Sequence, residues 1–301
     1  MIYHMKYQGM SMDTFKGIFP ALLTPFKKNG QINKQVLREL VEWNIGKGVN
    51  GFYVCGSTAE SFMLSSEERK SILETVCDQA HGRVPIIAHI GHISTEVAID
   101  LAQHAKQYGV DAISSVPPFY YNFSIDEIQR HYFEIVDTVA CPMVVYNFPA
   151  FSNVSFSESE LSTFFDDERF IALKNTSSDF FLLERLSKKY PNKIFFNGYD
   201  EMFLSGLAAG ATGAIGSTFN FMAEKFIRIQ QLLDANKFDE AQAEQGSANN
   251  IISVLCKVGV MSGAKAILRF MGFDFGEAKK PFHELSEDDV VLLKSACESI
   301  L

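Results

Sequence analysis

The chain has 301 residues, and its 36 acidic residues outnumber its 27 lysines and arginines, which gives a net charge of −9 with neutral histidines. Hydrophobic residues make up 47% of the chain and charged residues 21%, a balance typical of globular proteins and not of disordered or fibrous ones. The acidic balance disfavours a nucleic-acid partner, because phosphate binding needs a basic face and the chain has no long run of lysine or arginine.

The cysteines and the N-terminal segment indicate the compartment. Five cysteines are scattered along the chain without a C-x-x-C pair, which is typical of free thiols in a reducing environment. The first residues lack an apolar stretch of signal-peptide length, and nowhere does an uninterrupted apolar run reach the length of a membrane span. We therefore expect a cytoplasmic protein with no membrane partner.

Short runs rich in β-branched and aromatic residues alternate with longer segments of helical period along most of the chain. This alternation is the pattern of βα units around a parallel sheet. Successive runs start 20 to 34 residues apart, enough for a strand, a crossover helix and two short loops. The runs begin near Gly17, Gly51, Pro85, Asp111, Cys141, Phe170, Lys193 and Gly213.

The helical segments between these runs carry their own start and stop signals. Capping residues precede four of them, at Asn33, Ser65, Ser94 and Ser124. Ser65 is followed three residues later by a glutamate, which predicts a capping box. Glycines predicted to end the first and third helices stand at positions 48 and 109.

Eight βα units that close on themselves predict an α/β fold, a TIM (β/α)8 barrel. A doubly wound open sheet is the alternative, but such sheets usually carry G-x-G-x-x-G after the first strand, and this chain has none. We assign residues 1–235 to the barrel, after a short N-terminal extension. Residues 236–301 are predicted to form a C-terminal helical extension that packs on the barrel as part of a single structural unit, with a loop around Lys280-Pro281.

Two strand ends carry the residues best suited to chemistry, because TIM-barrel active sites lie at the carboxyl ends of the strands. Lys174 ends the apolar run that begins at Phe170. From spacing alone its amine is expected to reach water, but a desolvated amine with a lowered pKa is a nucleophile that forms Schiff bases. Tyr146 ends the neighbouring run, where its phenol could carry protons for an imine-forming lysine.

Other strand ends give weaker signals. Ser57 and Thr58 lie in a turn whose hydroxyls and backbone N–H groups suit a small carboxylate. Acids follow the seventh run at Asp200 and Glu201, where they also fit the first turn of a helix. His89 and His92 lack zinc spacing, so we expect no metal site. The glycine-rich segment GLAAGATGAIGS lacks the Gly-Lys-Ser/Thr of a phosphate-binding loop.

Five strand-end motifs occur together and in order: GSTAE at 56–60, YNFP at 146–149, LKNT at 173–176, NGYDE at 197–201 and GSTFN at 216–220. In this order the chain resembles the pyruvate-dependent class I aldolases, the family of N-acetylneuraminate lyases and dihydrodipicolinate synthases. The resemblance implies that Lys174 forms a Schiff base with the substrate's C2 ketone and that Tyr146 relays the proton of the C4 hydroxyl. It implies that Ser57 and Thr58 hold the substrate carboxylate and that no metal or organic cofactor takes part.

Within this family the lyase branch is the more similar. Phe151 follows YNFP in the segment where the synthases typically have an arginine for their second substrate. The implied reaction is the reversible cleavage of N-acetylneuraminate, a sialic acid, to N-acetylmannosamine and pyruvate. By the same resemblance, the sugar acid and its polyhydroxylated tail would be bound by Thr176, Gly198, Asp200, Glu201 and Ser217.

Alternatives to this reading stay open. An aldolase acting on another 2-keto-3-deoxy sugar acid would use the same mechanism, and dihydrodipicolinate synthase belongs to the same family. A binding or regulatory protein could keep the barrel without turnover, but Lys174 and Tyr146 are both present, which disfavours it.

The resemblance further implies a homotetramer in which Tyr120 completes a hydroxyl relay across a subunit interface. Two positions depart from the family pattern, because Ala59 and Ser178 stand where glycine is common. A Cβ there would crowd any backbone that needs a positive φ.

Overall fold

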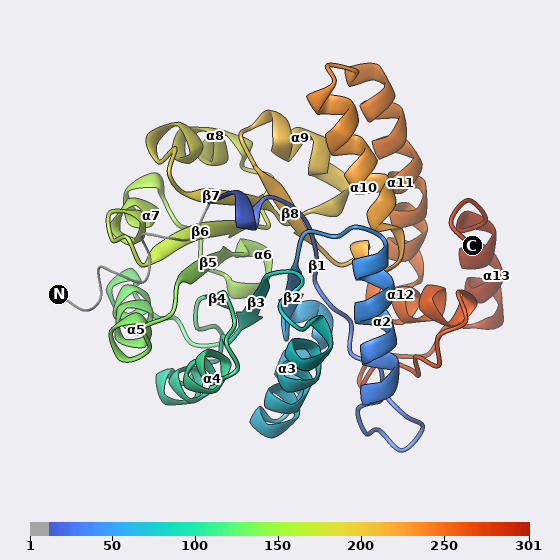
Figure 1. Cartoon of the computed structure of the whole chain (residues 1–301), viewed down its shortest axis with the longest axis horizontal. Coiled ribbons are helices and arrows are strands. Elements are labelled where there is room, and N and C mark those ends of the chain that lie inside the picture. Colours follow the sequence, from blue (N-terminus) through green and yellow to red (C-terminus); the bar gives the residue numbers. More distant parts are fainter. Residues whose placement is uncertain (1–11) are drawn as a thin grey trace.

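The computed structural model describes residues 12–301, and within them eight parallel strands form the predicted barrel (Figure 1). Neighbouring strands pair in the order β1-β8-β7-β6-β5-β4-β3-β2. The ring closes where Ala21, just after β1, bridges in parallel to Tyr53 of β2. The strands are β1 (Gly17–Pro20), β2 (Phe52–Val54), β3 (Ile86–His89), β4 (Ala112–Ser115), β5 (Met143–Asn147), β6 (Phe170–Asn175), β7 (Ile194–Asn197) and β8 (Gly213–Gly216). The predicted fold class and strand positions are confirmed.

Helices surround the barrel and begin where the sequence predicted. The Asn33 side chain accepts a hydrogen bond from the Val36 N–H, and Ser65 forms the predicted capping box with Glu68. Ser94 and Ser124 also cap their helices. The helices of the barrel are α2 (Lys34–Gly46), α3 (Ser66–Ala80), α4 (Thr95–Gln107), α5 (Ile125–Thr138), α6 (Pro149–Ser152), α7 (Glu158–Phe165), α8 (Phe180–Lys189), α9 (Phe203–Ala208) and α10 (Phe219–Asp234).

The apolar interior has two parts, because successive side chains of a strand point to opposite faces. One part lies inside the ring of strands and contains large aromatic side chains such as Phe19, Tyr53, Tyr146 and Phe196. The other lies between the strands and the surrounding helices. The inner part ends at the carboxyl ends of the strands, where short 3-10 helices form the first turns of two loops: η2 (Ser57–Ala59) and η4 (Asp200–Met202). The remaining 3-10 helices are η1 (Met12–Phe15) and η3 (Ser61–Met63).

Beyond α10 the chain continues as α11 (Phe238–Val258), α12 (Val260–Phe270) and α13 (Glu287–Ala296), which lie together on one side of the barrel (Figure 1). The buried residues of α11 follow a helical period: Ala241, Gln245, Ala248, Ile251, Ile252, Leu255 and Val258. No single helix in the described chain has the length and hydropathy of a membrane span, and α11 and α12 reach them only as a pair bent by 120°.

A buried ion pair joins this extension to the barrel. The Lys265 amine of α12 contacts the Glu60 carboxylate directly after η2, and both side chains are fully buried. The second oxygen of Glu60 accepts a hydrogen bond from the Lys279 N–H at 2.6 Å. Two segments distant in sequence are thus held together beside the carboxyl ends of the strands. The short N-terminal extension expected from the sequence lies mostly outside the described residues.

Candidate active site

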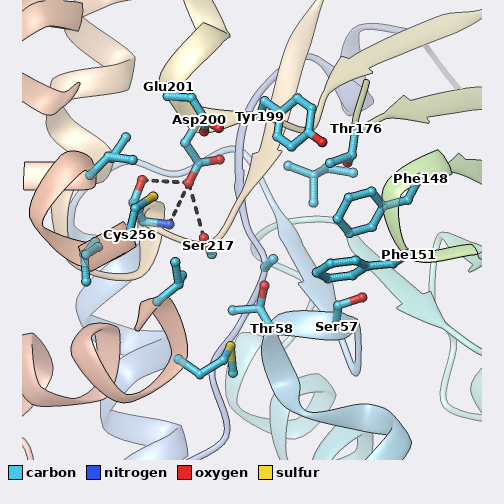
Figure 2. Close-up of a pocket in the computed structure, with 18 of the residues that line it drawn as sticks. Ser57, Thr58, Phe148, Phe151, Thr176, Tyr199, Asp200, Glu201, Ser217 and Cys256 are labelled. Carbon is cyan, nitrogen blue, oxygen red and sulfur yellow. Dashed lines mark hydrogen bonds between the residues drawn. The ribbon is translucent and has the colours of Figure 1, made fainter. Parts of the chain in front are cut away.

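A cavity of about 440 Å³ opens at the carboxyl ends of the strands. Figure 2 shows Asp200 and Glu201 on one side of it, Phe148 and Phe151 on the other, and Ser57 and Thr58 below them in this view. The residues that the sequence analysis assigned to catalysis or substrate binding within one chain all line this cavity: Ser57, Thr58, Tyr146, Lys174, Thr176, Gly198, Asp200, Glu201 and Ser217. The barrel therefore brings together motifs from five separate strand ends.

The Lys174 amine lies between two aromatic rings. Its Nζ is 4.0 Å from the ring centroid of Tyr146 and 4.3 Å from that of Tyr53. The lysine is only 4% exposed, and burial lowers the pKa of its amine to about 7, although the nearby Asp200 carboxylate raises it. A much larger fraction of the amine is therefore neutral at pH 7 than in an ordinary lysine, as a nucleophile that attacks ketones requires.

Tyr146 lies beside Lys174 because β5 and β6 pair in a register that sets the two residues opposite each other. Burial raises the pKa of the phenol well above its ordinary value, although the hydroxyls of Thr176 and Ser57 lower it. The phenol is thus protonated in the resting site, next to a partly neutral amine. This pair can form a carbinolamine and supply the proton with which it loses water.

The turn that carries Ser57 and Thr58 has positive φ values at both ends, 59° at Cys55 and 62° at Glu60. Ala59 lies in η2, and its carbonyl accepts a hydrogen bond from the Thr24 hydroxyl at 2.9 Å. Neither Ala59 nor Ser178 has a positive φ, so the condition under which a Cβ would crowd the backbone does not arise at these two positions. Next to Ala59, the left-handed conformation falls on Glu60 instead.

Asp200 is held by the loop after β8. One of its carboxylate oxygens accepts hydrogen bonds from the Thr218 N–H at 2.8 Å and the Thr218 hydroxyl at 2.7 Å, and it lies 3.4 Å from the Ser217 hydroxyl (Figure 2). Burial raises the pKa of Asp200 to about 6, partly offset by the hydrogen bonds from Thr218. From the extension, Gln245 donates to the Asp200 carbonyl at 3.1 Å and so helps fix the position of η4.

Two glycines leave room for these polar groups. A Cβ at Gly198 would lie 1.9 Å from the Thr176 hydroxyl oxygen, and one at Gly216 would lie 2.1 Å from a carboxylate oxygen of Asp200. Both distances are too short for any side chain. These glycines therefore permit close packing at the ends of β7 and β8.

The remaining wall of the cavity was missed in the sequence analysis. It comes from the extension and is mostly apolar: Ile252, Leu255, Cys256, Gly259, Val260, Met261, Ser262, Phe282 and His283. Two aromatic residues after β5, Phe148 and Phe151, were also not assigned to substrate binding. The helical pattern of the extension predicted packing on the barrel, but no local signal identified which turn reaches the cavity.

The other sequence-based expectations concern residues outside this cavity. His89 is buried, and no group of three histidine, cysteine or acidic side chains within residues 12–301 could hold a metal ion. Tyr120 is 84% exposed with a φ of 78° and does not line the cavity of its own chain. Its assignment to a relay between subunits remains a prediction.

Comparisons with known proteins agree with this geometry. The sequence profile of the dihydrodipicolinate synthetase family matches residues 14–299. An N-acetylneuraminate lyase of Rhizobium meliloti is 44% identical over 95% of both chains. The structure of the Clostridium difficile protein CdNal in complex with mannosamine is 36% identical, with a TM-score of 0.93 over 95% of this chain and 99% of that one. An N-acetylneuraminate lyase of Fusobacterium nucleatum complexed with pyruvate is 36% identical, with a TM-score of 0.92 over 97% and 99% of the two chains. The chain therefore belongs to the dihydrodipicolinate synthetase family.

Proposed function

We propose that this protein is an N-acetylneuraminate lyase, a carbon–carbon lyase that cleaves N-acetylneuraminate reversibly to N-acetylmannosamine and pyruvate. The observation that carries the proposal is the Lys174 amine, buried with a pKa near 7 and held against Tyr146 at the base of a cavity that Asp200 and Glu201 also line. The similarity to lyases over nearly the whole chain, one of them solved with pyruvate, supports the substrate.

The proposed chemistry begins at Lys174. Its neutral amine attacks the C2 ketone of the open-chain sugar acid, and the carbinolamine loses water to give an imine. The Tyr146 phenol donates the proton that leaves with this water and becomes a phenolate. The phenolate then takes the proton of the C4 hydroxyl, the C3–C4 bond breaks, and its electron pair moves through C2 to the imine nitrogen.

The products leave in sequence. The fragment with the new aldehyde at C4 is N-acetylmannosamine, and the enamine left on Lys174 takes a proton at C3 from the reprotonated Tyr146 phenol. Water then hydrolyses the protonated imine, the phenolate takes the proton that the water loses, and pyruvate leaves together with the free amine. The imine is the electron sink, so the proposed reaction calls for no metal or organic cofactor.

Two sets of side chains in the cavity bind the two ends of the substrate. The hydroxyls of Ser57 and Thr58 bind the carboxylate next to C2, close to Lys174. The sugar hydroxyls bind Asp200, Glu201 and Ser217, because carboxylates accept hydrogen bonds from several hydroxyls at once, and Thr176 and Gly198 contact the substrate between the two ends. All of these residues line the cavity, which supports this assignment.

The charges around the cavity favour a lyase over a synthase. Among the described residues that line it, Lys174 is the only lysine or arginine, and Phe151 occupies the segment where the synthases typically have an arginine. A second carboxylate-bearing substrate would thus meet an aromatic side chain there. The same argument leaves other 2-keto-3-deoxy sugar acids as the competing substrates.

We further propose that the protein works as a cytoplasmic homotetramer. Aromatic side chains at the mouth of the barrel are exposed in the single chain, including Phe62, Tyr120, Tyr121 and Phe151. Their burial between subunits would be favourable, and it would bring Tyr120 to the cavity of a partner. Sedimentation velocity tests this, since a monomer at micromolar concentration would contradict it.

Borohydride reduction in the presence of pyruvate tests the mechanism. We expect peptide mass spectrometry to find one adduct, on Lys174, and absence of an adduct on the folded protein would refute the proposal. Comparing the turnover of N-acetylneuraminate with that of 2-keto-3-deoxygluconate tests the substrate. A higher kcat/KM for the second compound would assign the protein to a different sugar acid.

A further inference from the structure

His89 is a buried histidine that the proposed reaction does not use. It is the last residue of β3, only 2% exposed, and it does not line the cavity. Its ring centroid lies 5.9 Å from that of Tyr53 and 6.1 Å from that of Tyr146. The imidazole is therefore one layer behind the two rings that flank the Lys174 amine.

Two backbone groups fix the tautomer of His89. Its Nδ1 lies 3.0 Å from the carbonyl oxygen of Cys55, which can only accept a hydrogen bond. Its Nε2 lies 3.3 Å from the backbone N–H of Val116, which can only donate. The proton is thus on Nδ1 and the lone pair on Nε2, and both ring nitrogens are used.

A neutral ring is required for this arrangement, because a protonated ring could not accept from Val116. The Arg69 guanidinium donates to the His89 carbonyl at 2.7 Å and to the Gly91 carbonyl at 3.0 Å, which brings a positive charge close to the ring. Burial and this charge lower the pKa of His89 well below its ordinary value. The hydrogen bonds of His89 therefore persist through the pH range in which Lys174 titrates.

The two hydrogen bonds lead to two loops of the site. Cys55 lies two residues before Ser57, and its φ of 59° is a left-handed conformation that costs a residue with a Cβ on the order of 1 kcal/mol. The bond from His89 holds the carbonyl of this strained residue. Val116 begins the other loop, which leads to Tyr120.

We propose that His89 is a positioning residue: its Nδ1–H holds the Cys55 carbonyl and thereby keeps Ser57 and Thr58 in place for the carboxylate of pyruvate. This role rests on the proposed function, in which that turn binds the 2-oxo acid. Without the bond, the strained residue relaxes and the hydroxyls move away from the carboxylate. Pyruvate affinity falls while the amine and the phenol stay where they are.

Substitution of His89 by asparagine or by glutamine distinguishes the contributions of its two hydrogen bonds. Asparagine places an amide N–H near the position of Nδ1, and glutamine places its amide near Nε2. We measure the apparent affinity for pyruvate from the saturation of the borohydride trapping rate. We expect His89→Asn to stay within about twofold of wild type, and His89→Gln to weaken pyruvate binding by about tenfold, the effect of one lost hydrogen bond. The trapping rate at saturation should change by less than about twofold in both.

His92→Asn is the matched control, because His92 lies three residues after His89, in the loop that follows β3, and its Nδ1 accepts from the nearby Ser94 N–H at 3.0 Å. We expect wild-type affinity for it. Equal weakening by His89→Asn and His89→Gln, or greater weakening by asparagine, overturns the inference. If His89→Gln does not fold, His89→Asn decides alone, since a tenfold loss there would also overturn it. A wild-type protein that forms no adduct refutes the proposed function itself, so the two failures are distinguishable.

Discussion

The cavity has two walls that differ in origin and chemistry. One wall is formed by the strand ends and their first loop turns, and it holds every polar group assigned to the reaction, from Ser57 to Ser217. The other comes from α11, α12 and the loop before α13, and its side chains are mostly apolar, as at Leu255 and Val260. The barrel thus supplies the reacting groups, and the extension gives the cavity its shape.

This difference predicts how substitutions in the two walls behave. A substitution at a strand end should change the rate of the chemical step. A substitution in the extension should instead change substrate affinity or weaken the contact between the extension and the barrel. The two walls meet at the Glu60–Lys265 ion pair and at Gln245, which contacts the backbone of Asp200. These contacts show that the extension also supports the reacting wall.

Tyr146→Phe gives the largest expected effect. Loss of the phenol removes the proton carrier, so kcat for N-acetylneuraminate should fall by about 10²- to 10⁴-fold. The Lys174 adduct with pyruvate should still form on long incubation, because the amine is intact. Steady-state kinetics with borohydride trapping checks both. Tyr199→Phe, which changes another tyrosine of the cavity, is the control, and a loss of less than tenfold for Tyr146→Phe contradicts the assigned role.

Glu60→Leu tests the ion pair that connects the barrel to the extension. It leaves the Lys265 ammonium buried without its carboxylate, which should lower the free energy of unfolding by about 3–5 kcal/mol. Urea denaturation measures this loss. The double variant Glu60→Leu with Lys265→Met should recover much of it, because no unpaired charge stays buried. A single variant as stable as wild type would show that the pair does not secure the extension.

The pH dependence of imine formation tests the buried amine. Because the pKa of Lys174 is about 7, the neutral fraction and the trapping rate should rise about tenfold per unit below pH 7 and level off above pH 8. An amine with an ordinary pKa would instead gain rate up to about pH 10. Trapping rates at saturating pyruvate from pH 5 to 10 distinguish these profiles.

Val260→Ser should have the smallest effect. Val260 lines the apolar wall and is 38% exposed, so the change weakens contacts with the sugar by a small amount. We expect KM for N-acetylneuraminate to rise about two- to fivefold, in line with the partial loss of apolar burial. Apparent affinity for pyruvate should not change. A large fall in kcat would mean that the extension takes part in the chemistry.

Local sequence signals predicted the barrel and placed Lys174 and Tyr146 at strand ends, whereas other residues of the polar wall, such as Thr176, came from the resemblance to the aldolase family. An apolar run that ends in Lys174 marks both a strand and its carboxyl end, and the fold then sets Tyr146 beside it. The apolar wall depends on how α12 packs across the barrel, which no local pattern at Val260 reveals. The role inferred for His89 depends on a tautomer set by the backbone of Cys55 and Val116, the residues that directly follow β2 and β4. From sequence spacing alone, His89 was identified only as part of an unsuitable metal motif.

The absence of a side chain at Gly216 restricts which substitutions this position can accept. The oxygen of Asp200 occupies the space that any larger residue would need. A methyl group there would push the carboxylate into the cavity or break its bonds to Thr218. In the proposed reaction Asp200 binds the sugar hydroxyls, so alanine at this position would displace a substrate-binding group without itself contacting the substrate.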